Sequence, residues 1–394
     1  MQADLSIPPY LFQSLLPSEE EEWTLISPQS DPTASFLAQS SEWLAFDASS
    51  QNSMENGQNG YQIASAYKSS FVQQMIFNQI KEAVFGPKDL RSGKGCAGHP
   101  LNHLIAYYLN LAEFYLSKIT FEKVAIPYSE KARLNGLLFA AYDRDGKTEP
   151  FDSQNVTALL FGGSFAPQEA YMVGIIEGYR QQGVQVLAFN YPGFGDNSDI
   201  EEPTTENFLG SGEAAFLFLI NLGISPDKIV CHGYSLGGYV AVKLAAKYNA
   251  NLLIDRTGWS TALIATTIIK NQLPESEVSA FLAGQIGSLT GFGVPLSLDE
   301  LKAVQKKIFI VQETDKKITE IATLTLVKKL VEEGHLLESQ VSLHWIQESH
   351  FSSPSNTWTV NKKLSHLLQE TRIENEANNE ARKAWKLFLN GIKG

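Results

Sequence analysis

The sequence has few cysteines and no long apolar run. It contains two cysteines, Cys96 and Cys231, among 394 residues, which argues against a disulfide framework and is typical of a reducing compartment. It contains no run of about 18 apolar residues, so we expect no membrane-spanning helix. Residues 1–10 include Asp4 but no lysine or arginine, which is not the pattern of a signal peptide. We therefore expect a cytoplasmic protein.

The sequence is also poor in positive charge. It has 31 lysines and arginines against 43 aspartates and glutamates, which gives a net charge of −12. This balance argues against a nucleic-acid partner and gives no reason to expect attraction to an anionic membrane. His99 and His103 flank Pro100, but no further ligand clusters near them. We therefore expect no metal site there. The chemistry predicted below requires neither a metal nor an organic cofactor.

Apolar residues, in contrast, are plentiful. They make up 43% of the chain, enough for a sizeable core, and the length fits one large α/β domain plus an accessory piece. Residues 1–60 are polar and acidic, and apolar residues at helical spacing follow in 61–85 and 101–119. We predict a polar, then helical N-terminal extension over residues 1–119 and a main domain over residues 120–394.

From about residue 120, short predicted strands alternate with predicted helices. This alternation predicts an α/β fold with a mostly parallel central sheet, helices on both faces, and an active site at the carboxyl ends of the strands. Residues 260–304 lack strand signals, and we expect a small helical cap there. The predicted strands are 120–128 and 134–142, as an antiparallel pair, then 156–161, 184–189, 228–231, 251–254, 307–311 and 341–346; the predicted helices are 168–182, 211–222 and 319–333.

The most informative motif surrounds Ser235. Residues 228–231 lead through His232 into Gly233-Tyr234-Ser235-Leu236-Gly237, and residues 240–247 have the apolar spacing of a helix. In this strand–turn–helix context, G-x-S-x-G holds a serine on a strained turn with its hydroxyl exposed at the end of the sheet. The two glycines remove Cβ atoms that would collide with the neighbouring strand and helix. Ser235 is therefore the candidate nucleophile.

A serine nucleophile needs a base beside it. The chain order Ser, Asp, His places that base after the last strand. His350 fits, because it follows the strand predicted at 341–346 directly. We expect the other histidines of this domain to be structural or exposed: His232, His335, His344 and His366.

The carboxylate that orients the base should follow the penultimate strand. Asp315 lies shortly after Val311, the last apolar residue of that strand, and it is the candidate that we favour. Glu313 is a near neighbour and could replace it. Asp255, directly after the strand 251–254, is the third candidate, because some enzymes of this type carry the acid one strand earlier.

Acyl transfer also requires two backbone N–H groups that face the developing oxyanion. One is expected from Leu236, the residue after the nucleophile. The other is expected from the loop after strand 156–161, where Gly162-Gly163 lets the backbone approach a substrate; Ser164 is our first choice and Phe165 the second. A plain strand–helix turn is the alternative for this glycine pair.

These motifs resemble those of the α/β-hydrolase superfamily. Gly233-Tyr234-Ser235-Leu236-Gly237-Gly238 resembles its nucleophile elbow, residues 190–198 resemble its loop after the fourth strand, and Gly162-Gly163 resembles its oxyanion loop. The resemblance covers about residues 120–370 and implies the α/β-hydrolase fold. Phe161 precedes the glycine pair where many relatives have a histidine, and residues 312–315 lack the glycine that is common before the acid.

A narrower resemblance is to hydrolase-like proteins of intracellular bacterial pathogens, such as the chlamydial CHLPS-type family and the Legionella SidB-type effectors. Size, the polar N-terminal extension and the acidic stretch Glu374-Asn375-Glu376 with Glu380 carry it. The resemblance implies delivery into the cytosol of a host cell and a host protein as a further partner. An ordinary solvated helix is the alternative explanation of the acidic stretch.

The C-terminal segment is predicted to be a helix over residues 373–392. Its apolar side chains and its lysines and arginines would allow contact with a membrane surface, but for so acidic a chain we favour docking on the main domain.

Together, these residues predict a serine hydrolase that cleaves a carboxylic ester or thioester through an acyl-enzyme. The substrate is expected to be a small molecule, such as a lipid or lysophospholipid, or an acylated protein. Apolar residues of the cap could line an acyl pocket or could only pack the cap onto the core. A catalytically silent binding module with the same fold, and a peptidase or amidase with the same three residues, are the alternatives.

Overall fold

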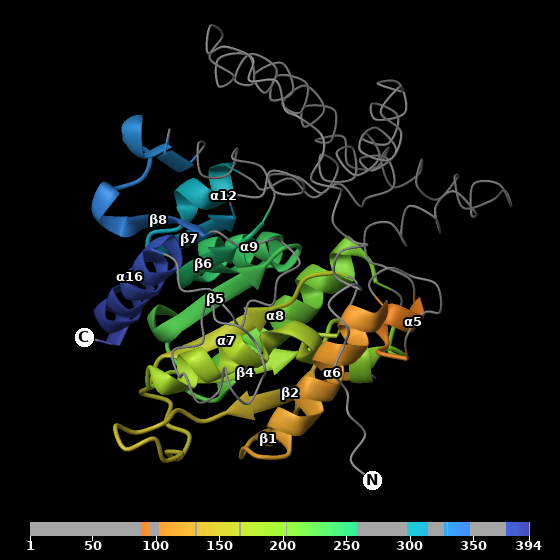
Figure 1. Ribbon diagram of the computed structural model, residues 1–394. Coiled ribbons are helices and arrows are strands. Elements are labelled where there is room, and N and C mark those ends of the chain that lie inside the picture. The colour runs from red at the N-terminus through yellow and green to blue at the C-terminus, as the bar shows by residue number, and fades with distance from the viewer. Residues whose placement is uncertain are drawn as a thin grey trace, which may run out of the picture. The chain divides into compact units, whose positions relative to one another are not determined.

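The computed structural model (Figure 1) describes residues 88–94, 102–130, 132–164, 167–201, 203–257, 298–313, 327–328, 330–346 and 376–393. The predicted helix 61–85 and nearly all of the predicted cap lie outside these residues. The domain boundary predicted at residue 120 remains a prediction.

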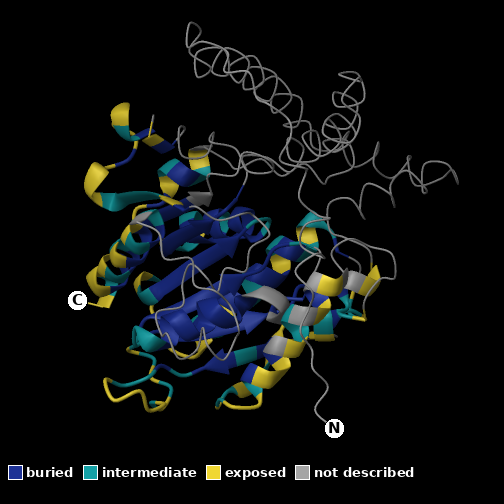
Figure 2. Ribbon diagram, in the orientation of Figure 1, coloured by how far each residue is buried: buried dark blue, intermediate teal, exposed yellow. Residues whose placement is uncertain are grey.

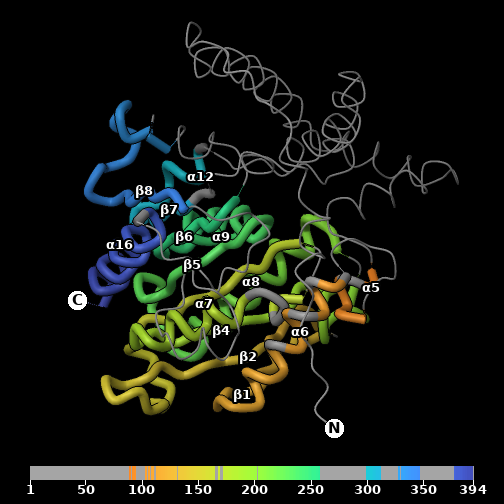
Figure 3. Tube along the Cα trace, in the orientation of Figure 1, coloured from red at the N-terminus to blue at the C-terminus, as the bar shows by residue number. Residues whose placement is uncertain are grey.

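In the described part of the chain, eight strands form one sheet in the order β1-β2-β4-β3-β5-β6-β7-β8. β2 runs antiparallel to both of its neighbours, β1 and β4, whereas all the other neighbours are parallel. Figure 3 shows the colour passing along the sheet from yellow at β2 through green at β5 to blue at β8. The strands are β1 (Glu122–Pro127), β2 (Arg133–Phe139), β3 (Thr157–Phe161), β4 (Gln185–Phe189), β5 (Ile229–Tyr234), β6 (Asn251–Asp255), β7 (Ile308–Glu313) and β8 (Val341–Ile346).

Helices cover both faces of this sheet. Side chains of α7 and α16, such as Tyr179 and Trp385, pack on one face, and side chains of α8, α9 and α12, such as Phe216 and Val240, pack on the other. Figure 2 shows the central strands buried and the outward faces of the helices exposed. The helices are α5 (Lys88–Arg91), α6 (Asn102–Leu116), α7 (Glu169–Gln181), α8 (Thr205–Asn221), α9 (Gly237–Tyr248), α12 (Leu298–Ala303) and α16 (Glu376–Lys393).

The central strands β3, β4, β5 and β6 are buried at every residue. They can be apolar along most of their length because helices cover both of their faces. Successive side chains point to opposite faces, so Leu159 packs with α8 and α9 while Leu160 packs with α7 and α16. A slip of one residue would exchange these two faces. Burial therefore fixes the register, which places Tyr234 opposite Asp255 at the carboxyl ends of β5 and β6.

Most predicted elements are confirmed with small shifts at their ends, but the prediction for α8 was wrong at its start. The helix predicted over residues 211–222 begins at Thr205 and ends at Asn221. The side chain of Thr204 accepts a hydrogen bond from the backbone N of Asn207 at 3.1 Å, which satisfies one of the free donors at a helix N-terminus. This cap, together with the buried Phe208, stabilises the additional turns.

The helix predicted over residues 101–119 is α6, and it packs directly on α7. Ala112 and Tyr115 of α6 are buried against Val173 of α7. The Tyr115 hydroxyl donates to Oε2 of Glu177 at 2.5 Å. Arg91, at the end of α5, is buried and its Nη1 donates to the carbonyl of Gly193 at 2.9 Å. The described part of the predicted extension is therefore joined to the sheet domain by buried contacts.

The C-terminal helix α16 docks on the domain, as we favoured. Trp385 and Leu389 are fully buried, and Phe388 packs on the same face of the sheet. Among the described residues, no helix is long and apolar enough to cross a membrane.

Candidate active site

Ser235 lies at the sharp turn between β5 and α9. Its φ is 51°, in the left-handed region that residues with a Cβ rarely adopt. The backbone N of Ser235 donates to the carbonyl of Asp255 at 2.9 Å, and the backbone N of Gly238 donates to the carbonyl of Ser235 at 3.1 Å. The turn is thus held by the next strand on one side and by its own helix on the other. Ser235 and Leu236 are both half-buried.

The two glycines of the motif are required by close contacts, as predicted. A Cβ on Gly233 would lie 2.5 Å from the carbonyl oxygen of Gly237, within the helix that follows. A Cβ on Gly237 would lie 2.1 Å from the carbonyl oxygen of Phe161, on the neighbouring strand. Both obstacles are backbone atoms, which cannot move aside without moving the sheet or the helix.

The predicted oxyanion loop lies beside the same turn. A Cβ on Gly163 would be 3.3 Å from Cβ of Ser235 and 3.2 Å from Cδ1 of Tyr234. The glycine backbone is therefore packed against the serine side chain, and a larger residue would crowd it. Ser164, our first choice for the second N–H donor, follows Gly163 and is half-buried. The second choice, Phe165, lies outside the described residues.

Two of the predicted site residues, Asp315 and His350, also lie outside the described residues. The strands that would carry them are present, because β7 ends at Glu313 and β8 ends at Ile346. Both strands run parallel to β5, so their carboxyl ends lie at the same edge of the sheet as Ser235. The roles of Asp315 and His350 remain predictions.

Asp255, the third candidate for the acid, is already engaged elsewhere. It is fully buried, and its Oδ1 and Oδ2 accept from Nε and Nη2 of Arg256 at 2.8 Å and 3.3 Å. Burial alone would raise the pKa of Asp255, but Arg256 and His232 lower it below its ordinary value. An acid that orients a catalytic imidazole would need one of these oxygens, so the arrangement disfavours Asp255 in that role.

His232 belongs to the same buried cluster, as expected of a structural histidine. Its Nδ1 lies 3.0 Å from the hydroxyl of Tyr179, and its Nε2 lies 3.6 Å from Oδ2 of Asp255. Burial lowers the pKa of His232, against the opposing effect of Asp255. Tyr179 in turn packs edge-on against Trp385 of α16, with 5.1 Å between the ring centroids. The cluster lies beneath the serine turn, on the face covered by α7 and α16.

Two further histidines of the main domain, His335 and His344, are described, and His103 is exposed on α6. His344 lies within β8, its ring stacks on Phe309 at 5.0 Å between centroids, and its Nε2 lies 2.7 Å from the hydroxyl of Ser342. His335 is exposed in the loop before β8. Among the described residues, no group of three or more histidine, cysteine, aspartate or glutamate side chains could hold a metal ion.

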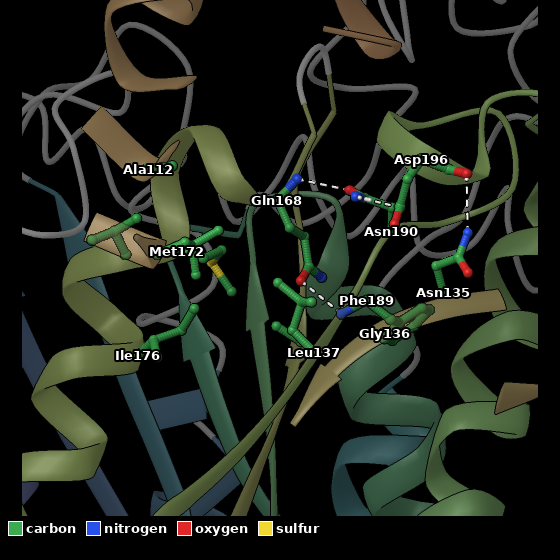
Figure 4. Close-up of a pocket in the computed structure, with 13 residues that line it drawn as sticks. Ala112, Asn135, Gly136, Leu137, Gln168, Met172, Ile176, Phe189, Asn190 and Asp196 are labelled. Atoms are coloured by element: carbon green, nitrogen blue, oxygen red, sulfur yellow. Dashed lines mark hydrogen bonds between the residues drawn. The ribbon is translucent and has the colours of Figure 1, made fainter. Parts of the chain in front are cut away.

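Sequence reasoning missed the contacts of two buried amide side chains, Gln168 and Asn190. Oδ1 of Asn190 accepts from the backbone N of Gln168 at 2.8 Å. Both residues line a small cavity between α6, α7, β2 and β4 (Figure 4). The cavity has a volume of about 20 Å³, which is room for one water molecule and not for a substrate. In the sequence, Gln168 is only the first residue of a predicted helix, so no pattern marked it.

Comparison with solved structures identifies the architecture. The structure of an α/β-hydrolase from Vibrio vulnificus superposes with a TM-score of 0.51 at 22% identity, over 76% of this chain and 94% of that one. The chain has the α/β-hydrolase fold. This finding confirms the predicted fold class. No protein-family model matches the chain.

Curated relatives match parts of the chain in sequence, among them a toxin and a lipase. A multifunctional-autoprocessing repeats-in-toxin protein of Vibrio vulnificus is 33% identical over 135 residues, which are 32% of this chain and 2% of the toxin. The phosphatidylserine lipase ABHD16A of Bos taurus is 29% identical over 107 residues, which are 27% of this chain and 18% of the lipase. In both cases the match spans a small part of the relative.

Proposed function

We propose that this chain is a serine hydrolase that cleaves a carboxylic ester through an acyl-enzyme formed on Ser235. The observation that carries the proposal is the left-handed backbone of Ser235 at the end of β5, with Gly163 packed against its side chain. A serine held in this conformation presents its hydroxyl beyond the sheet edge. The backbone N–H groups at the start of α9 favour the negative charge that develops in acyl transfer.

In the proposed mechanism, His350 takes the proton from the Ser235 hydroxyl as that oxygen attacks the ester carbonyl, and returns it to the leaving alcohol. Asp315 holds the imidazole in the required tautomer. The backbone N–H groups of Leu236 and Ser164 bind the oxyanion. Water then attacks the acyl-enzyme while His350 accepts a proton from that water. This second step releases the carboxylic acid and restores the Ser235 hydroxyl.

For the substrate, we propose the acyl ester of a lipid. The name of the matching phosphatidylserine lipase supports this class. The net charge of −12 does not favour adsorption to an anionic bilayer. Phosphatidylserine and phosphatidylcholine should therefore be compared in neutral mixed micelles, beside p-nitrophenyl esters of increasing chain length and a matching thioester. Delivery into a host cell, which the effector-type resemblance implies, remains a prediction. In its support, one of the matching relatives is by name a toxin.

The nucleophile is tested by a fluorophosphonate probe, which reacts with activated serines. Wild-type protein should be labelled at Ser235, and Ser235→Ala should abolish labelling and ester turnover without lowering the Tm. Ser211→Ala is the matched control, because Ser211 is buried in α8, where its hydroxyl donates to the carbonyl of Phe208 at 3.1 Å. If well-folded wild-type protein is not labelled, the silent binding module becomes the better description.

The base is tested by a second matched pair. His350→Ala should reduce the labelling rate and kcat by at least about 100-fold, within the range typical of general-base catalysis. His344→Ala, within β8, should leave both rates nearly unchanged. An equal loss from His344→Ala would contradict the assignment of His350.

A further inference from the structure

Gln168 directly precedes α7, yet its side chain does not cap that helix. Its backbone is already helical, with φ −56° and ψ −36°, and its side chain makes no capping hydrogen bond. The residue is only 3% exposed. Its amide instead reaches two strands: Nε2 donates to the carbonyl of Leu160 at 2.9 Å, and Oε1 accepts from the backbone N of Phe189 at 3.1 Å. Figure 4 shows the side chain pointing from the start of α7 toward Phe189.

These two hydrogen bonds lie where the ladder between β3 and β4 stops. Leu160 opposite Ala188 is the last pair of that ladder, and the next residue of β3, Phe161, is paired with β5. The amide of Gln168 therefore joins the two strands just beyond their last direct pair. It satisfies a backbone acceptor and a backbone donor that are both buried, and leaving such groups unpaired is costly.

The same amide closes the loop that carries the candidate oxyanion donor. The hydrogen bond from Gln168 to Leu160 joins the end of β3 to the start of α7, and Ser164 lies between these two elements in the sequence. Gly163, within the loop, packs against Cβ of Ser235. Asn190 adds a second connection, because its Oδ1 accepts from the backbone N of Gln168 and its Nδ2 donates to Oδ1 of Asp196 at 3.2 Å.

We propose that Gln168 is a positioning residue of the active site. Its amide holds the loop so that the backbone N–H of Ser164 faces the oxyanion, and Gln168 itself does not touch the substrate. The inference rests on the proposed function. Such donors are effective only when they are held in place before the reaction, and a misplacement of about 1 Å can reduce a rate by about 100-fold.

The chain contains a matched control for this proposal in Gln185. This glutamine is also fully buried, and its amide also bonds to backbone groups: Nε2 donates to the carbonyl of Asp152 at 2.9 Å, and Oε1 accepts from the backbone N of Asp152 at 2.7 Å. It lies at the amino end of β4, whereas Gln168 contacts the carboxyl end. Gln168→Met and Gln185→Met each remove a buried amide and keep a side chain of similar length.

Both variants should lower the Tm, but only Gln168→Met should slow the chemistry. We expect the rate of fluorophosphonate labelling at Ser235, and kcat for a p-nitrophenyl ester, to fall about 10- to 100-fold, with KM nearly unchanged. Wild-type rates in folded Gln168→Met would overturn the proposal. An equal fall in Gln185→Met would also overturn it, because loss of stability alone would then explain both. Absence of labelling in the folded wild type would instead refute the proposed function.

Gln168→Glu provides a second test, the pH dependence of the labelling rate at Ser235. A residue that only stabilised the fold would not change this pH dependence. An ionised glutamate can accept from Phe189 but cannot donate to the carbonyl of Leu160, whereas the protonated acid can do both. Burial raises the pKa of a carboxyl at such a site, so the labelling rate of Gln168→Glu, divided by that of the wild type at the same pH, should rise as the pH falls from 9 to 5. A flat ratio would contradict the proposal.

Discussion

Two residues at the centre of the site, Ser235 and Arg256, have an unusual backbone. Their φ angles are 51° and 50°, and residues held in this region typically cost about 1–3 kcal/mol each. They lie at the ends of neighbouring strands and are connected through Asp255, whose carbonyl accepts from Ser235 and whose carboxylate binds Arg256. The backbone N of Arg256 also donates to the carbonyl of Val311 on β7 at 3.0 Å. Strain at this corner is thus offset by hydrogen bonds to the sheet.

The buried cluster beneath that corner makes stability depend on pH. His232 is faced by Tyr179 of α7 and by Asp255 and Arg256 at the end of β6, and Tyr179 in turn packs against Trp385 of α16. Burial lowers its pKa below the value of about 6.5 in the unfolded chain. Below that pH the unfolded state binds the proton more readily than the folded state, so the free energy of unfolding should fall as the pH falls from 7 to 5, by up to about 1.4 kcal/mol per pH unit for one proton.

His232→Gln should lower stability at pH 7, because the contact with Tyr179 is altered, but should flatten this pH dependence. Urea unfolding at pH 7, 6 and 5 measures both effects. His335→Gln, at an exposed histidine, is the control and should keep the wild-type slope. A slope in His232→Gln equal to that of the wild type would show that another group carries the proton.

Among single residues, the sequence pointed to the serine and glycines of the turn, whose contacts lie mostly within one short motif. Ser235 and its glycines are recognisable because the contacts that require them come from a short strand–turn–helix motif. Gln168 was not recognisable, because its partners are the backbones of Leu160 and Phe189, and a backbone partner leaves no pattern in the sequence. Arg256 was missed for a related reason: its left-handed backbone depends on hydrogen bonds to β7.

At the scale of the element, two glycines of α8 should respond to substitution in opposite ways. Gly210 is exposed, and a Cβ there would meet only Cε2 of Tyr128 at 3.7 Å. Gly210→Ala should therefore raise the free energy of unfolding by about 0.5–1 kcal/mol, because alanine favours a helix over glycine. Gly212 faces α9, and a Cβ there would lie 2.4 Å from Cγ1 of Val240. Gly212→Ala should lower the free energy of unfolding by about 1–3 kcal/mol.

Urea unfolding of the two variants measures this difference. The two positions share one helix, so a general effect of alanine on helix propensity would shift both in the same direction. Stabilisation by Gly212→Ala would mean that α8 and α9 are not packed as closely as the structure has them.

The elements themselves were predicted best where burial is complete. The central strands β3, β4 and β6 are uninterrupted buried runs, and their predicted positions differ from the observed ones by a residue or so. The start of α8 was missed, because its N-terminal turns depend on the cap at Thr204. The order of β3 and β4 in the sheet could not come from the residues alone. It was implied only by the resemblance to α/β-hydrolases.

At the scale of the molecule, α6 is packed on the sheet domain through α7. Ile105, Ala112 and Tyr115 are buried, and the last two pack against Val173. A chain that begins at residue 120 would lose these side chains and expose Val173, and each fully buried apolar side chain is worth roughly 1.5–3 kcal/mol. We expect this shorter chain to have a markedly lower Tm than the full chain, or to aggregate. An unchanged Tm would support the boundary predicted at residue 120.

The position of the serine turn within the chain has a consequence for its biosynthesis. The strands that hold the turn, β3, β5 and β6, all lie between Thr157 and Asp255, whereas β8 does not begin until Val341. A ribosome that adds about 5–20 residues per second therefore delivers the strands around Ser235 several seconds before the segment that carries the predicted base. A nascent chain can thus form the turn that holds Ser235 on the translating ribosome before the segment that carries His350 has been made.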